Sequence, residues 1–169
     1  MGITESATLA FTYDGSLLKS TTWPGGIVGS VEQTYDNFFR LSALTVNAAN
    51  PVTFNYDDDG YFASSTGLAI FTSQRDLTNG LLSGSTLTST PNITDSWTYN
   101  GFDEPKTYSS LSEATQLYLV SGVARDNLGR ATARTETVKS TATPCAYTYD
   151  ARGRLALVTP GRSSAKLCS

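Results

Sequence analysis

A two-residue motif, Tyr-Asp, returns along this chain at a nearly constant interval. Complete or degraded copies stand at Tyr13-Asp14, Tyr35-Asp36, Tyr56-Asp57, Thr78-Asn79, Tyr99-Asn100, Arg125-Asp126 and Tyr149-Asp150. The acidic or amide residues of these copies lie 22, 21, 22, 21, 26 and 24 positions apart. A period of this length is typical of repeat proteins, in which each repeat is one supersecondary unit.

The residues around the motif predict a β-hairpin in each repeat. Aromatic residues often stand at the motif's Tyr and two positions before it, as in Trp97-Thr98-Tyr99, and such residues share one face of a strand. The Asp favours a turn, because its carboxylate accepts hydrogen bonds from amides just downstream. A glycine often follows three positions later (Gly60, Gly129, Gly153) and suits the left-handed residue of a short hairpin loop.

The sequence therefore predicts an all-β array of about seven antiparallel hairpins, forming a curved, spiralling sheet. The segment Leu111–Val120 is the best helix candidate, but we predict a strand there. At 169 residues the chain is long enough to bury a core in one domain. We expect one repeat domain over 1–160 and a tail outside the repeat register over 161–169. Its units lie near 9–30, 31–50, 52–72, 74–94, 95–120, 121–143 and 145–160.

The segment from Tyr149 to Leu155 reads Tyr-Asp-Ala-Arg-Gly-Arg-Leu. It resembles the repeat core Tyr-Asp-x-x-Gly-Arg-Leu of the YD-repeat, or rearrangement-hotspot (Rhs), family of bacterial proteins. Gly129-Arg130 matches in part, and the segment Asn37–Leu41 keeps Arg-Leu with Phe39 at the glycine position. The resemblance covers roughly residues 9–160.

The resemblance implies a spiral of hairpins that closes into a hollow shell. In insecticidal toxin complexes and Rhs effectors this shell encloses a C-terminal toxic domain, and the related teneurins use a similar shell in adhesion. Because full shells are much longer, we expect this chain to form part of a shell wall. The implied partners are flanking domains of a larger shell or toxin chain. The implied location is outside the cell or at its surface, although Met1–Glu5 lacks the features of a signal peptide.

Catalysis finds little support in the sequence. The chain has no histidine, which excludes Ser-His-Asp and Cys-His catalysis and histidine metal ligation. Most aspartates fall in the repeated turns, where a structural role is the simpler interpretation. The cluster Asp57-Asp58-Asp59-Gly60 does not continue as an EF-hand loop, because Leu68 stands at the twelfth position. We predict no enzyme activity, no cofactor and no metal site.

A recognition module is the alternative function. Aromatic residues in the repeat register are expected to form a ladder along the sheet. Those outside it are the candidate contacts for a carbohydrate or a cell-surface partner, namely Trp23, Tyr61, Tyr108 and Tyr118. The exposed edges of a hairpin array also predict self-association.

The remaining composition narrows the partners. The chain lacks an apolar run long enough to span a membrane. Nucleic-acid binding is not expected, since the net charge is −3. Cys145 and Cys168 could pair if their strands are neighbours, but two cysteines make no disulfide framework and we favour free thiols.

Overall fold

Tight turns at or near the Tyr-Asp copies divide the chain into antiparallel strands. A computed structural model describes residues 8–161, which contain fourteen strands and no helix. The all-β prediction is therefore confirmed. The segment Leu111–Val120 is not a helix, but it is not one continuous strand either: one strand ends at Ser112, a turn covers 113–114, and the next strand begins at Thr115. The strands are β1 (Ala10–Asp14), β2 (Leu17–Trp23), β3 (Gly29–Tyr35), β4 (Leu41–Val46), β5 (Ala49–Tyr56), β6 (Phe62–Thr66), β7 (Ile70–Arg75), β8 (Leu82–Thr88), β9 (Ile93–Tyr99), β10 (Pro105–Ser112), β11 (Thr115–Arg125), β12 (Ala131–Val138), β13 (Thr141–Tyr149) and β14 (Leu155–Pro160).

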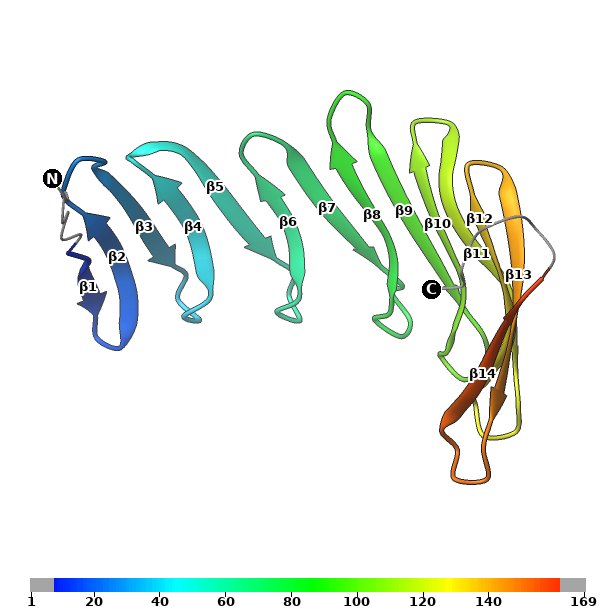
Figure 1. The fold of residues 1–169 in the computed structure, drawn as a ribbon. Coiled ribbons are helices and arrows are strands. Elements are labelled where there is room, and N and C mark those ends of the chain that lie inside the picture. The colour runs from blue at the N-terminus through cyan, green and yellow to red at the C-terminus, as the bar shows by residue number, and fades with distance from the viewer. Residues whose placement is uncertain (1–7, 162–169) are drawn as a thin grey trace, which may run out of the picture. The chain divides into compact units, whose positions relative to one another are not determined.

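The chain forms two compact units, residues 1–72 and 73–169. In the first unit, β1 to β6 lie side by side in chain order, each antiparallel to the next (Figure 1). β6 also pairs with Phe71 and Thr72 of β7. In the second unit, β8 to β14 follow the same meander. Consecutive strands pair because each is joined to the next by a short turn.

A β-bulge recurs beside the motif's tyrosine. The pairing register shifts immediately before Tyr13, Tyr35, Tyr56 and Tyr149, so that one residue of the following strand is left over. A bulge bends its strand and increases the local twist. Because the bulge occurs at the same motif position in these hairpins, it belongs to the repeat itself.

The two faces of the strands carry different side chains. The residue before the motif's tyrosine meets a hydroxyl across the hairpin: Thr12 Oγ1 lies 2.6 Å from Ser20 Oγ, Thr34 Oγ1 lies 2.9 Å from Ser42 Oγ, and Thr98 Oγ1 lies 2.6 Å from Thr107 Oγ1. The tyrosines face the other way, as the alternation of a strand requires.

The apolar core is smaller than the chain length suggested. Among residues 8–161, Cys145 alone is a buried apolar residue, at 2% exposure, and no large side chain is fully buried. The expected core is absent for a geometric reason. Neither unit places a helix or a second sheet over the aromatic face in the described part of the chain, so that face stays half buried.

Strand pairing continues to the last described residue. The Gly161 N–H donates to the Pro144 carbonyl at 2.6 Å, which extends the pairing of β13 with β14 by one residue. The rest of the predicted tail, residues 162–169, lies outside the described residues. The boundaries of the individual repeat units remain predictions.

Candidate functional site: the Tyr-Asp turn and the Trp23 groove

The Asp of the motif holds its turn together with both carboxylate oxygens. In the turn after β11, Asp126 Oδ1 accepts the N–H groups of Leu128 and Arg130 at 2.9 and 3.0 Å. Asp126 Oδ2 accepts the Arg130 Nε–H at 2.7 Å. The backbone closes the turn through an Asp126 N–H bond to the Arg130 carbonyl. Asp36 with Arg40 and Asp150 with Arg154 repeat this arrangement at 2.7–2.9 Å.

These contacts keep the turn carboxylates ionised. Side-chain hydrogen bonding from Arg130 is the largest influence on Asp126 and lowers its pKa below the usual 3.8, against a smaller desolvation effect. The amide of Arg154 does the same for the pKa of Asp150. At Asp36 desolvation raises the pKa, but the hydrogen bonds from Arg40 and Phe38 together outweigh it and the net pKa is lowered. Hydrogen bonds to the charged form stabilise that form.

The tyrosine of the motif joins one hairpin to the preceding one. Its hydroxyl donates to a backbone carbonyl at the start of the strand that follows the previous turn. The four donor–acceptor pairs are Tyr35 to Leu18 at 2.9 Å, Tyr56 to Leu41 at 2.9 Å, Tyr99 to Leu82 at 2.8 Å and Tyr149 to Ala131 at 2.8 Å. The tyrosine that precedes the turn Asp thus connects its own hairpin to the preceding one.

The arginine four residues after the Asp reaches forward to the next hairpin. The Arg40 guanidinium carbon lies 4.4 Å from the centre of the Tyr56 ring, and that of Arg130 lies 4.5 Å from the centre of the Tyr149 ring. Both are cation–π contacts. A Cβ built on Gly60 would lie 3.3 Å from Arg40 Nη1, and one on Gly153 would lie 3.4 Å from Arg130 Nη1. The next turn's glycine therefore also makes room for this arginine.

One hairpin makes the equivalent contacts with different residues. Asn100 replaces Asp, Glu104 replaces Arg, and Arg125 replaces the next Tyr. The Asn100 amide donates to Glu104 Oε2 at 2.7 Å, and Glu104 Oε2 pairs with Arg125 Nε at 3.2 Å. Arg125 Nη2 then donates to the Pro105 carbonyl at 3.0 Å, where a tyrosine hydroxyl would otherwise donate. Arg125-Asp126 is a degraded copy of the motif in sequence, yet the contact is preserved.

The structure differs from the sequence pattern at two copies of the motif. Thr78-Asn79 does not begin a turn: Asp76 accepts the Thr78 N–H at 2.8 Å, and the Asp76 N–H bonds the Leu81 carbonyl. The loop is one residue longer than the loops after Asp36, Asp126 and Asp150. The motif position itself is Arg75-Asp76, which follows Asp57 by 19 positions (76 − 57) rather than 21 or 22. Asp14 was placed with the other turn aspartates, but it pairs with Leu17 in a two-residue turn.

Among the four candidate ligand contacts, Tyr108 and Tyr118 belong to an aromatic ladder. The ring centres of Trp97 and Tyr108 lie 5.1 Å apart, and those of Tyr108 and Tyr118 lie 5.9 Å apart. The Tyr108 hydroxyl donates to Asp95 Oδ1 at 2.9 Å. Desolvation, followed by this bond to Asp95, raises the pKa of Tyr108. Both rings are half buried, and a role in ligand contact remains a prediction.

The other two candidates are placed differently. Tyr61 is 52% exposed and stands four residues after Asp57, where other repeats have the motif's arginine. Its N–H donates to Asp57 Oδ1. Trp23 ends β2 and lies against the backbone of Gly29, where a Cβ would meet the indole at 2.3 Å. The structure thus brings Tyr108 and Tyr118 together, and it places Trp23 and Tyr61 in two different hairpins.

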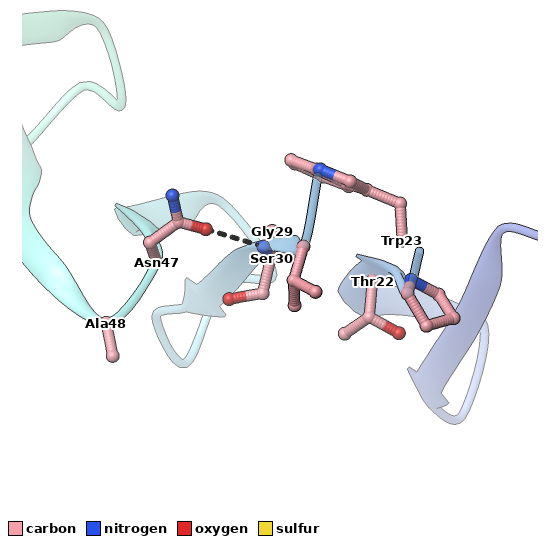
Figure 2. Close-up of a pocket in the computed structure, with 8 residues that line it drawn as sticks. Thr22, Trp23, Gly29, Ser30, Asn47 and Ala48 are labelled. Carbon is pink, nitrogen blue, oxygen red and sulfur yellow. Dashed lines mark hydrogen bonds between the residues drawn. The ribbon is translucent and has the colours of Figure 1, made fainter. Parts of the chain in front are cut away.

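Trp23 lines a groove of about 600 Å³ (Figure 2). The groove is bounded by Thr22, Pro24, Val28, Gly29, Ser30, Asn47 and Ala48. Asn47 Oδ1 accepts the Ser30 N–H at 2.7 Å, which fixes the amide at the rim. The adjoining loop exposes Ile27 and Val28, at 85% and 74%. An aromatic ring, polar rim groups and an open apolar wall are features of ligand sites.

The expectation of free thiols is wrong for Cys145, which is in a disulfide. Cys168, the other cysteine, lies outside the described residues. Spacing along the sequence could not reveal the bond, because a disulfide requires close Cα atoms in the folded chain. Cys145 itself lies buried in β13.

Two further searches concern metals and membranes. In the stretch from residue 8 to 161, no three His, Cys, Asp or Glu side chains are grouped so that they could hold a metal ion. The same stretch contains no helix long and apolar enough to cross a membrane.

Comparison with known proteins identifies the family. The family model of the teneurin YD-shell matches residues 3–167. The crystal structure of TcdB2-TccC3-Cdc42 is similar over 92% of this chain, with a TM-score of 0.72 and 16% identity, and the Photorhabdus luminescens Tc holotoxin pore over 90%, with 0.71 and 15%. This chain covers 9% of each of those chains. A comparison with curated protein sequences finds no match.

The repeated Tyr-Asp turn and the contacts between successive hairpins extend through the residues that the family model matches. The chain belongs to the teneurin YD-shell family.

Proposed function

We propose that this chain is a section of shell wall, without chemistry of its own, that encloses or presents another domain of a longer exported protein. The supporting observation is the contact between hairpins. The hydroxyls of Tyr35, Tyr56, Tyr99 and Tyr149, and the guanidinium of Arg125 at the tyrosine's position, each donate to a backbone carbonyl of the preceding hairpin. These repeated polar side chains hold one hairpin to the next, which is the role expected of a wall.

A protection experiment tests enclosure. The complete reading frame that contains this segment is expressed, and each flanking domain is also made alone. We expect an enclosed domain to resist a protease that digests the same domain in isolation. Equal digestion rates would refute enclosure, and electron microscopy of the intact protein would then decide whether the wall only presents its neighbour.

A second candidate function rests on the Trp23 groove. We propose that this groove recognises carbohydrate, since an indole with amide and hydroxyl groups at its rim suits a sugar ring. A glycan array compares the chain with Trp23→Ala and with Phe102→Ala, an exposed aromatic outside the groove. Binding that Trp23→Ala abolishes and Phe102→Ala retains is expected. No binding at high protein concentration would exclude the carbohydrate function.

A further inference from the structure

The first hairpin lacks an arginine that later hairpins possess. Four residues after the turn Asp stand Arg40, Arg130 and Arg154 in three later hairpins, but Leu18 stands there after Asp14. The first turn is also shorter, because Asp14 pairs with Leu17 and only Gly15 and Ser16 lie between them. The sequence spacing of the motif hides this difference.

The later hairpins show what normally occupies the corresponding place. Arg40 and Arg130 each form an ion pair at 2.7 Å with the Asp of their own turn. Each also lies over the tyrosine ring of the next hairpin, at 4.4 and 4.5 Å. A carboxylate from one hairpin and a tyrosine face from the next thus form one receptor for a guanidinium group.

In the first unit both halves of this receptor border a pocket instead. Asp14 and Tyr35 line a pocket of about 300 Å³, together with Leu17, Lys19, Asp36 and Phe39. Within residues 8–161 the ion pairs of turn aspartates involve Asp36, Asp126 and Asp150, and none involves Asp14. Asp14 is exposed, so its carboxylate is accessible from solvent.

We propose that this pocket binds the arginine side chain of a partner protein. The guanidinium would pair with Asp14 and lie over the Tyr35 ring, as Arg40 does with Asp36 and Tyr56. Arginine suits the site better than lysine, because its planar group both pairs with a carboxylate and stacks on an aromatic face. The site is distinct from the Trp23 groove and does not depend on enclosure by a shell.

Lys19 is the competing occupant within the chain. It lines the same pocket, five residues after Asp14, and is the leftover residue of the β1–β2 bulge. Its exposed position leaves the pocket open, and the charge of Asp36 is already met by Arg40. Removal of Lys19 is therefore a necessary arm of the test.

The probe is N-acetyl-arginine methylamide, titrated against the isotope-labelled chain of 169 residues and followed by NMR. N-acetyl-citrulline methylamide, which has nearly the same shape without the charge, is the matched ligand. We expect saturable shifts at Asp14, Leu17 and Tyr35 with arginine alone. Asp14→Asn and Tyr35→Leu should each weaken binding about two- to fivefold. Asp59→Asn, an exposed turn acid outside the pocket, should leave the Kd unchanged.

Three outcomes would overturn the proposal. Citrulline could produce the same shifts, Asp14→Asn could leave the Kd unchanged, or binding could arise only after Lys19→Ala, which would assign the pocket to Lys19. Should Tyr35→Leu fail to fold, Asp14→Asn still decides, because Asp14 is an exposed turn residue.

Discussion

At the scale of single residues, the copies of the motif differ in which residue occupies the left-handed position of the turn. Gly60, Gly129 and Gly153 have φ angles of 83°, 78° and 79°. Phe39 holds the same position with φ 64°, and Asp103 with φ 60°. A side chain with a Cβ pays a steric penalty there that glycine avoids.

We predict that Phe39→Gly stabilises the protein. Relief of the left-handed strain contributes about 1–2 kcal/mol, and the extra chain entropy of glycine removes about 0.5–1 kcal/mol. The Phe39 ring is mostly exposed, so little apolar burial is lost. Urea denaturation should show a net gain of about 0.5–1 kcal/mol in the free energy of unfolding. Gly153→Ala is the matched control and should be destabilising.

The turn carboxylates predict loss of stability in acid. The pKa values of Asp126 and Asp150 in the folded chain lie below 3.8, so the stability they contribute is present above that pH and is lost as the pH falls through the folded pKa. Asp126→Asn should flatten this decline, because an asparagine side chain does not titrate. The turn should be kept, since Asn100 accepts the equivalent amide bonds in its own turn. Urea midpoints from pH 6 to 2.5 test this, with Asp58→Asn as control. An identical decline in Asp126→Asn would contradict it.

At the scale of elements, each hairpin is completed by its neighbour rather than by a shared core. The hydroxyl of the motif's tyrosine and the guanidinium of the motif's arginine cross from one hairpin to another. A local change should therefore weaken the junction between two hairpins more than either hairpin itself.

We predict that Tyr149→Phe lowers the free energy of unfolding by about 0.5–1.5 kcal/mol, the usual contribution of one hydrogen bond. The change removes only the bond to the Ala131 carbonyl and keeps the ring under Arg130. Hydrogen exchange should show that the loss lies at the β12–β13 junction. Tyr13→Phe, in the exposed strand β1, is the control. Equal effects of both changes would argue against the role of the hydroxyl.

The ion pair between Glu104 and Arg125 predicts that substitutions at these two positions have strongly coupled effects on stability. Glu104→Arg alone should destabilise by about 1 kcal/mol, because it removes the ion pair and brings two guanidinium groups together. Adding Arg125→Tyr should recover most of this loss by recreating the stacking seen between Arg130 and Tyr149. A double-mutant cycle measures the coupling, and additive effects would show that the two positions act independently.

At the scale of the whole molecule, strand edges decide how the chain associates. Among the described strands, β1 pairs only with β2, and β14 only with β13. An unpaired edge offers its N–H and C=O groups to another chain. Leu155 and Leu157 of β14 are more than half exposed, which adds apolar surface beside that edge.

We therefore predict that the chain self-associates as its concentration rises. Leu157→Lys should reduce association, since a charge on an edge strand opposes pairing with another edge. Light scattering over a wide concentration range measures the mean mass. Leu68→Lys, at an exposed position between β6 and β7, is the control and should change nothing. A monomer at every concentration would refute the prediction.

The period of the Tyr-Asp motif was enough to predict the hairpins and the turn role of the aspartates, and the resemblance to the family came from the segment Tyr149–Leu155. These features depend on local chemistry, because strand alternation and a carboxylate bound to nearby amides involve residues close in sequence. The sequence did not reveal that Asp76 begins the fourth turn, because Arg75 stands in place of the tyrosine and Asp76 follows Asp57 by only 19 positions (76 − 57).

The contacts between hairpins became visible only in the folded chain. The partner of Tyr149 is a carbonyl eighteen residues earlier, and the partner of Glu104 is Arg125, which the motif had marked as degraded. The disulfide of Cys145 and the pocket beside Asp14 and Tyr35 likewise depend on residues that only the folded chain brings together. The sequence alone determined the repeating hairpin and its turn, since both are local. Only the tertiary structure decided which side chains meet across hairpins, because strand register and turn length set those distances.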